Sequence, residues 1–281
     1  NNILAVTFTK ASSEEMKERF ISLNESPQLN VRNVNFGTFH STFFKIIKKY
    51  HNYNSNNVLG ERDRYNLIKN LVKSIDNGAY EDDEYIKDIL LDISLYKSDY
   101  HKSRFFPDSM NKEDFYKLLE HYEENKIKNN KIDFDDMLLN CYDLLKSNPK
   151  ILKDVRRKFQ YILIDEFQDI NNIQFEIVKL ITKPLNNLFV VGDDDQSIYS
   201  FRGANPYFIV SFDEIYENTK KVILNRNYRS QENIIKIANS LIVNNKNRVD
   251  KQMIPTISKT VDINFLNPIN KEDENKEIIR I

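Results

Sequence analysis

The segment YILIDEFQD, from Tyr161 to Asp169, decides the fold class of this chain. It begins with a strand-length apolar run, Tyr161–Ile164, and two carboxylates follow directly as Asp165 and Glu166. An apolar run without polar alternation is typical of a strand that is covered on both faces of a parallel sheet. Open α/β sheets bind ligands at the carboxyl ends of such strands. The segment therefore predicts a buried strand that delivers two acids to a ligand site.

Similar apolar runs recur along the chain and predict further strands at Ile3–Phe8, Val34–Phe36, Leu188–Val191 and Val222–Leu224. Patterns with helical spacing lie between them, at Ser12–Leu23, Ser41–Tyr50 and Asn172–Thr182. Strands that alternate with helices predict an α/β fold with a mostly parallel sheet.

The stretch from about residue 55 to 130 differs, because it shows helical spacing and heavy charge but no clear strand. Its expected helices are Tyr65–Ile75, Tyr85–Leu95 and Lys112–Lys126. We interpret it as a helical insertion within the α/β domain. The tail predicts a strand at Val261–Leu266 and a helix at Lys271–Ile281.

The composition excludes several classes of protein. Of the 281 residues, 30% are charged and 40% hydrophobic, which is ordinary for a globular protein and argues against disorder along the whole chain. The net charge of −1 does not by itself indicate nucleic-acid binding. Cys141 is the only cysteine, which excludes an intrachain disulfide, fits a reducing cytoplasmic compartment and predicts a core position. No apolar run reaches the roughly 20 residues of a membrane-spanning helix.

Asp165 and Glu166 have the chemistry of a nucleotide-hydrolysing site. One carboxylate can hold Mg²⁺, and the next can orient or deprotonate the attacking water. Taken alone, the pair could instead be a solvated strand end that carries incidental acids.

A second acidic strand end follows the run Leu188–Val191, as Gly192-Asp193-Asp194-Asp195-Gln196. A neutral Gln196 beside a phosphate site can sense the γ-phosphate by hydrogen bonding. Tyr199 and Phe201, next to Arg202, could form a stacking platform for unpaired bases. Packing in the core is the alternative for this aromatic pair.

Three shorter segments carry hydroxyl, imidazole or aromatic groups. Phe8 and Thr9 end the first predicted strand, and Thr38 and His40 follow the second. Such uncharged groups contact phosphates well, although either segment could simply cap a helix. The segment Asn227–Ser230 offers an aromatic to cover a base and an arginine to reach a phosphate, or else a helix start.

Together, in this order, these segments closely resemble the UvrD/Rep-type superfamily 1 DNA helicases. The resemblance covers nearly the whole chain and rests on VTFTKASSEEMKERF (Val6–Phe20), GTFHS (Gly37–Ser41), DFDDML (Asp133–Leu138), ILIDEFQDINNIQ (Ile162–Gln174), VVGDDDQSIYSFRGA (Val190–Ala204) and NYRSQENIIKIAN (Asn227–Asn239). It implies a RecA-like, P-loop NTPase-type parallel sheet with an all-helical inserted subdomain. It also implies ATP and Mg²⁺ as cofactors, and 3′-to-5′ translocation on single-stranded DNA with unwinding at single-strand/duplex junctions in repair or replication.

The resemblance also implies a role for each matching residue. Asp165 would coordinate Mg²⁺, Glu166 would activate water, and Gln196 would couple the γ-phosphate to DNA. Tyr228 would stack on adenine and Arg229 would reach the γ-phosphate. The expected DNA contacts are Phe8, Thr9, Thr38, His40, Tyr199, Phe201 and Arg202. Many family members have Thr-Asn-Lys-Ala where this chain has Thr9-Lys10-Ala11-Ser12, so no role is carried over to Lys10.

The expected domains are a first motor lobe from residues 1–54 and 131–223, a helical insertion at 55–130, and the start of a second lobe at 224–281. None of the five glycines, Gly37, Gly60, Gly78, Gly192 and Gly203, belongs to a G-x-x-x-x-G-K-[ST] phosphate loop. In the family this loop precedes the VTFT strand, so we expect it upstream of Asn1. We expect the remaining C-terminal motifs after Ile281, and negligible ATPase activity from these residues alone.

Two other function classes stay open at this point. One is a catalytically inactive, helicase-like module that binds DNA or a partner, although intact Asp165, Glu166 and Gln196 argue against decay. The other is a helicase–nuclease subunit, or a Mg²⁺ nuclease that uses the Asp193–Asp195 cluster. The string GDDDQSIY favours a stand-alone helicase.

Overall fold

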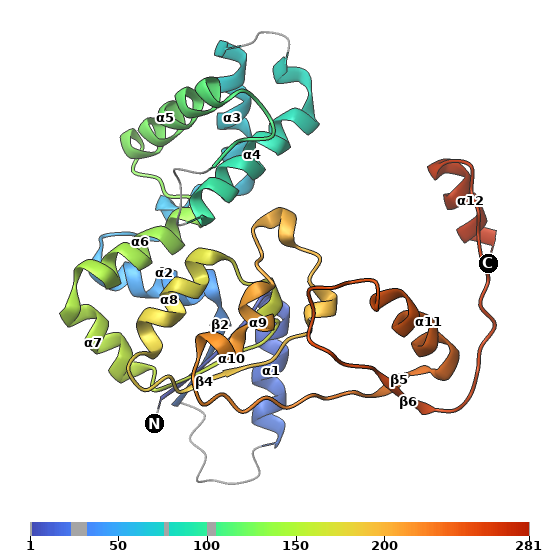
Figure 1. The fold of residues 1–281 in the computed structure, drawn as a ribbon. Helices are drawn as coiled ribbons and strands as arrows, with labels where there is room; N and C mark the ends of the chain where they lie inside the picture. The colour runs from blue at the N-terminus through green and yellow to red at the C-terminus, as the bar shows by residue number, and fades with distance from the viewer. Residues whose placement is uncertain (1, 24–32, 76–78, 100–104, 281) are drawn as a thin grey trace. The chain divides into compact units, whose positions relative to one another are not determined.

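The computed structural model describes residues 2–23, 33–75, 79–99 and 105–280 (Figure 1). Gly78 and the last residue of the predicted helix at 271–281 lie outside the described residues. The chain forms two compact units, Asn1–Thr219 and Lys220–Ile281, each of which is described by itself. Among the described residues, no helix has the length and apolar character needed to cross a membrane.

The first unit contains a parallel four-stranded sheet with the order β2-β1-β3-β4. Its strands are β1 (Ile3–Thr7), β2 (Val34–Thr38), β3 (Tyr161–Ile164) and β4 (Leu188–Val190). β1 is central, pairing with β2 on one side and β3 on the other. The predicted α/β fold with a parallel sheet is confirmed, and four of the five runs first predicted as strands form it.

Helices pack against this sheet and share one core with it. The helices of this part are α1 (Lys10–Leu23), α2 (Phe39–Tyr50), α6 (Phe134–Ser147), α7 (Pro149–Lys158), α8 (Asn172–Thr182), α9 (Tyr207–Val210) and α10 (Phe212–Ile215). Phe43, Ile47 and Ile177 are fully buried there. Cys141 is buried among them, as predicted, and burial raises the pKa of its thiol.

The expectation that the strands are covered on both faces is right for β1 and wrong for β3 and β4. Leu4–Thr7 are buried throughout. In β3, by contrast, burial alternates, and Leu163 is 36% exposed. Phe189 of β4 is 61% exposed, and β4 lies at the edge of the described sheet. Apolar residues on one face of β3 and β4 therefore remain open to solvent.

The predicted insertion consists of helices with a separate core. α3 (Glu61–Ile75), α4 (Asp83–Ser98) and α5 (Lys112–Lys128) lie side by side (Figure 1). Their buried apolar side chains include Ile68, Ile89, Phe115, Leu118 and Tyr122. This core is distinct from the one beneath the sheet, so the helices can bury their apolar faces against one another.

The chain enters and leaves this helical part through two adjacent segments. The Leu59 N–H donates to the Ile132 carbonyl at 2.8 Å, and the Ile132 N–H donates to the Asn57 carbonyl at 2.8 Å. Val58 and Ile132 thereby form an isolated parallel bridge. The segments that lead into and out of the helical part are thus paired with each other.

The second unit contains a two-stranded parallel sheet and two helices. They are β5 (Arg226–Gln231), α11 (Glu232–Ile242), β6 (Ile254–Ile257) and α12 (Lys271–Arg280). The predicted strands at Val222–Leu224 and Val261–Leu266 are wrong, and Asn227–Ser230 lies in β5 rather than at a helix start.

Backbone pairing explains these differences. The register pairs Arg226 with Ile254, so β5 begins after the exposed run Val222–Leu224. The backbone of Val261 is hydrogen-bonded by the side chain of Asn233 instead of by a neighbouring strand.

Candidate functional site

The predicted site residues of the first unit follow the carboxyl ends of the four parallel strands. Because the strands are parallel, these ends share one edge of the sheet. Backbone hydrogen bonds hold the loops together: the Asp165 N–H donates to the Val6 carbonyl at 2.9 Å, and the Phe167 N–H donates to the Val191 carbonyl at 2.9 Å. These two bonds join the carboxyl ends of β1, β3 and β4 through their backbones.

Asp165 and Glu166 form the acidic end of β3. Asp165 is partly buried, and burial raises its pKa, with the negative charge of Glu166 adding to the effect. Glu166 is exposed and has a left-handed backbone, with φ 53° and ψ 43°. Asp169 is also buried; its Oδ1 atom has no hydrogen-bond partner among the described residues, and burial raises its pKa.

These carboxylates fit a hard divalent cation. Mg²⁺ prefers carboxylate oxygens and water as ligands. Desolvated carboxylates with raised pKa values lack a compensating positive charge, which a bound cation supplies. Asp165, with Glu166 beside it, is therefore the residue at this edge of the sheet that would hold such a cation.

The loop after β4 is ordered by the side chain of Asp193. Its Oδ1 accepts from the Asp195 N–H at 3.2 Å, and its Oδ2 accepts from Gln196 Nε2 at 2.7 Å. Gln196 itself is exposed. Asp193 thus caps the short 3-10 turn Asp194–Gln196 (η6) and fixes the Gln196 side chain.

Sequence reasoning missed Gln168, which is 2% exposed and joins the two acidic strand ends. Its Nε2 donates to Glu166 Oε2 at 2.8 Å, and its Oε1 accepts from the Asp193 N–H at 3.0 Å. The residue lies inside the quoted string DEFQD, but no local pattern indicates a contact with residue 193.

The predicted stacking residues come together from two distant parts of the sequence. The rings of Phe8 and Tyr199 are stacked, with centroids 6.3 Å apart and planes 10° apart. Phe201 lies 6.1 Å from Tyr199, and the Arg202 guanidinium lies over both rings at 5.5 and 5.4 Å. Phe8 and Phe201 are 41% and 55% exposed, so the cluster offers aromatic surface to solvent rather than packing in the core.

Thr9, Thr38 and His40 have local structural partners. The Thr9 hydroxyl accepts from the Ser12 N–H at the start of α1. Thr38 caps α2 in a reciprocal capping box with Ser41. The ring of His40 packs edge-on against Phe134, and burial lowers its pKa despite the nearby charge of Asp135.

Tyr228 and Arg229 lie in β5 of the second unit. Tyr228 is 72% exposed, and Arg229 is exposed as well. The Asn227 side chain accepts from the backbone N–H groups of Arg229 and Ser230, both at 2.9 Å. This turn-like arrangement holds the backbone while both side chains remain accessible.

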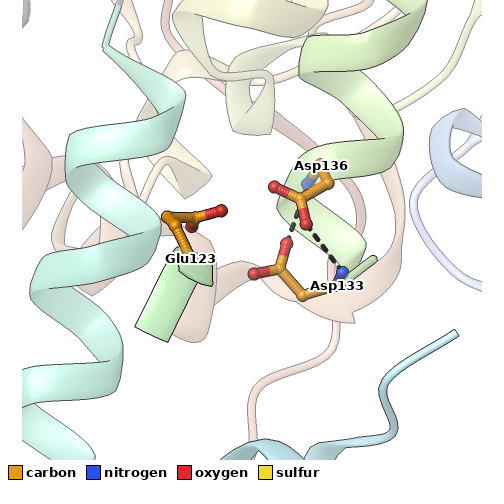
Figure 2. Close-up of side chains that lie close together, drawn as sticks. All are labelled: Glu123, Asp133 and Asp136. Atoms are coloured by element: carbon orange, nitrogen blue, oxygen red, sulfur yellow. Dashed lines mark hydrogen bonds between the residues drawn. The ribbon is translucent and has the colours of Figure 1, made fainter. Parts of the chain in front are cut away.

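A second acidic cluster, made of Glu123, Asp133 and Asp136, resembles a metal site (Figure 2). Asp133 and Asp136 form the capping box of α6, as the dashed lines in Figure 2 mark. The ammonium groups of two lysines, however, lie where a metal ion would bind. Lys97 Nζ lies 2.7 Å from Asp133 Oδ2, and Lys126 Nζ lies 3.1 Å from the same atom.

This cluster is an ion-pair network that joins α4, α5 and α6. Burial tends to raise the pKa of Asp133, but the charges of Lys97 and Lys126 outweigh it and hold that pKa well below its usual range. Burial, together with the charge of Asp133, raises the pKa of Asp136. Lys97 and Lys126 each also contact Glu123, at 2.8 and 2.9 Å. The two lysines already occupy the position of a cation among the three acids, so the cluster is structural.

Two family models together match nearly the whole chain. Residues 1–217 match the model of the UvrD/REP helicase N-terminal domain, and residues 222–281 match that of the UvrD-like helicase C-terminal domain. The chain is 40% identical over 259 residues to YjcD of Bacillus subtilis, covering 90% of this chain and 34% of that protein.

Two other relatives are named as ATP-dependent DNA helicases. Rep of Buchnera aphidicola (from Acyrthosiphon pisum) is 34% identical over 288 residues, covering 100% of this chain and 44% of that protein. PcrA of Bacillus subtilis is 33% identical over 282 residues, covering 97% of this chain and 37% of that protein. The chain thus spans less than half the length of these relatives. The two matched domains account for nearly all of its residues, and the chain belongs to the UvrD/Rep helicase family.

Proposed function

We propose that this chain is part of an ATP-dependent DNA helicase that translocates 3′ to 5′ on single-stranded DNA and unwinds duplexes at single-strand/duplex junctions. One observation carries the proposal: the loop of residues 192–202 connects the acidic end of β3 with an exposed aromatic cluster. Gln168 links Glu166 to this loop, and Tyr199 and Phe201 lie further along it. A motor needs such a connection between a nucleotide site and a DNA track.

At the nucleotide site, Asp165 would hold Mg²⁺, which, when bound, offsets the charge of the phosphate oxygens. Glu166, exposed beside it, would accept the proton of the water that attacks the γ-phosphate. Gln196, fixed by Asp193, would hydrogen-bond to the γ-phosphate. From the second lobe, Tyr228 would stack on adenine and Arg229 would reach the γ-phosphate.

On the DNA track, Phe8, Tyr199 and Phe201 would stack on unpaired bases. Base–aromatic stacking contributes about 1–3 kcal/mol per base and tolerates any sequence, as a translocating motor requires. Arg202 would contact the phosphate backbone, and Thr9, Thr38 and His40 would line the same strand ends. Because His40 is half-buried and its pKa is lowered, it would act as a neutral hydrogen-bonding group.

We propose a first motor lobe at residues 1–54 and 131–223, a helical insertion at 55–130, and the start of a second lobe at 224–281. The separate core of α3, α4 and α5 supports the insertion, and the match of two family domains supports the two lobes. The open edge of β4, with the exposed Phe189, supports a further strand there that carries the phosphate loop. A lone buried cysteine fits a cytoplasmic location.

The alternative nuclease function receives less support. Its three candidate ligands were Asp193, Asp194 and Asp195, but the Asp193 carboxylate accepts hydrogen bonds from Asp195 and Gln196 within its own turn. A carboxylate used in this way is a cap rather than an open metal ligand.

The proposal is tested with Glu166→Gln in the whole protein. Removing a general base should lower the DNA-stimulated ATPase rate by a factor of at least about 100, the lower end of what such catalysis contributes. Binding of a fluorescent single-stranded oligonucleotide should stay within a factor of about two, because Glu166 does not contact the aromatic cluster. Unchanged turnover would remove Glu166 from the catalytic role.

A further inference from the structure

Gln168 is a buried polar residue whose contacts are not explained by folding of its own segment. It lies on the 3-10 turn Phe167–Asp169 (η5), directly after Glu166. Its side chain contacts Glu166 and Asp193, and its backbone carbonyl accepts from the Ser197 hydroxyl at 3.4 Å. Gln168 therefore bridges the end of β3 and the loop after β4.

The chemistry of these contacts requires an amide. Glu166 Oε2 needs a donor, whereas the Asp193 N–H needs an acceptor. An amide in one orientation satisfies both, and rotating it by half a turn would place its NH₂ group against the Asp193 N–H. Glutamate would supply only acceptors at neutral pH, and an aliphatic side chain would supply neither group. The two partners thus fix both the identity and the orientation of Gln168.

Gly192 makes room for this amide. A Cβ atom at position 192 would lie 2.5 Å from Gln168 Oε1 and 3.1 Å from the Phe167 backbone nitrogen. Both separations are too short for ordinary van der Waals contact, so a side chain at 192 would displace the amide or the turn. The glycine after β4 thereby leaves room for the Gln168 amide and also for the Ile209 side chain, whose Cδ1 would lie 2.7 Å from that Cβ atom.

The hydrogen bonds continue beyond Gln168. Glu166, Gln168, Asp193 and Gln196 form an unbroken series, with separations of 2.8 Å, 3.0 Å and 2.7 Å between successive partners. A displacement of the loop after β4 is therefore transmitted to one oxygen of the Glu166 carboxylate. Its other oxygen stays available to accept from water.

We propose that Gln168 is a positioning residue that orients the Glu166 carboxylate and couples this orientation to the DNA-contacting loop. This inference rests on the proposed ATPase function. When single-stranded DNA stacks on Tyr199 and Phe201, the loop after β4 moves the Asp193 N–H, and the rigid amide of Gln168 turns the carboxylate toward its catalytic position. Gln168 itself is buried and would touch neither ATP nor DNA.

The test uses Gln168→Glu in the whole protein, because this change keeps the size and the acceptor for Asp193 but removes the donor to Glu166. The DNA-stimulated kcat should fall by at least about tenfold, since small misplacements of a catalytic group cost one to two orders of magnitude. The KM for ATP and the affinity for a fluorescent oligonucleotide should stay within about twofold of wild type, because the buried Gln168 would contact neither ligand.

Gln174→Glu is the matched control. Gln174 is also buried, six positions further on, and its Oε1 accepts from the Asn171 N–H in the capping box of α8. A glutamate performs this capping role equally well, so kcat should be unchanged. If Gln168→Glu does not fold, as judged by circular dichroism, Gln168→Met is used instead; it removes both the donor to Glu166 and the acceptor for the Asp193 N–H without adding a charge, and should lower kcat as well.

The two proposals fail in different ways. If Glu166→Gln abolishes turnover but Gln168→Glu and Gln168→Met both retain the wild-type DNA-stimulated kcat, the positioning role is wrong and the ATPase proposal stands. If Glu166→Gln retains full turnover, the ATPase assignment itself is wrong. If Gln174→Glu lowers kcat as much as Gln168→Glu does, the positioning role is also wrong.

Discussion

Glu166 combines an exposed carboxylate with a backbone conformation that disfavours any residue with a Cβ atom. The left-handed region costs such a residue roughly 1–2 kcal/mol. The conformation is held by neighbours, since the Phe167 N–H is bonded to the Val191 carbonyl and Gln168 anchors the side chain. The strain therefore lies at the residue to which we assign the chemistry, a common location for stored strain.

At the residue scale, we predict that Asp165→Asn stabilises the protein when divalent cations are absent. The pKa of Asp165 is raised in the folded state, so its ionisation works against folding. This penalty is absent below about pH 3.9, the usual pKa of an aspartate, and develops as the pH rises through the higher folded-state value. At pH 7 the melting temperature of Asp165→Asn should therefore lie above that of wild type.

Differential scanning calorimetry at pH 3 and pH 7 measures this effect. The two proteins should melt together at pH 3 and separate at pH 7. Asp154→Asn on α7 is the control, because Asp154 forms only an exposed pair with Arg157 that contributes little. A lower melting temperature for Asp165→Asn than for wild type at pH 7 would contradict the prediction.

At the scale of elements, apolar runs predicted strands correctly where the partner strands bury them. β1 and β3 match their predicted runs to within a residue. The run Val222–Leu224 failed because strand formation depends on a partner, and β6 pairs from Arg226 onward. Local hydrophobicity indicates burial in a sheet but carries no information about register.

The candidate site, like the strands, could be predicted only in part from the sequence. The apolar runs that end in Asp165–Glu166 and Asp193–Gln196 indicated acids at strand ends, and parallel strands place such ends at one edge of the sheet. Side-chain partners across long separations could not be inferred. Lys97 and Asp133 lie far apart in the sequence, and charged helices are ordinarily solvated, so nothing indicated that Lys97 and Lys126 would be buried against Asp133.

This network leads to a prediction about α4. Lys97→Met leaves a single ammonium group, that of Lys126, for the buried acids Asp133 and Asp136. Breaking a buried ion pair in this way costs about 3–5 kcal/mol of unfolding free energy. Adding Asp136→Asn should recover part of the loss, because it removes one uncompensated charge.

Urea denaturation followed by circular dichroism measures the change. Lys117→Met on α5 is the control, since its pair with Glu113 is exposed and should contribute less than about 1 kcal/mol. Equal stabilities of Lys97→Met and wild type would show that the network does not hold α4 to α6.

At the scale of the whole molecule, the open edge of β4 predicts self-association of the 281-residue chain produced alone. Unpaired strand edges and exposed apolar faces are templates for pairing with another chain. Phe189→Lys should lower this association, because a charge on an edge strand opposes pairing. Sedimentation velocity over a range of concentrations measures it, with Leu185→Lys, outside the strand, as the control. A wild-type chain that stays monomeric at all concentrations would contradict the prediction.

The pairing of Leu59 with Ile132 has a consequence for how this architecture can vary. Since the chain leaves the sheet-bearing part and returns to it at adjacent residues, a tight turn could join the two positions without moving any strand. The helices between them are thus a cassette that can be lengthened, exchanged or removed while the sheet is kept. Such an exchange must also replace Asp133 and Asp136, whose charges are neutralised by lysines that the cassette supplies.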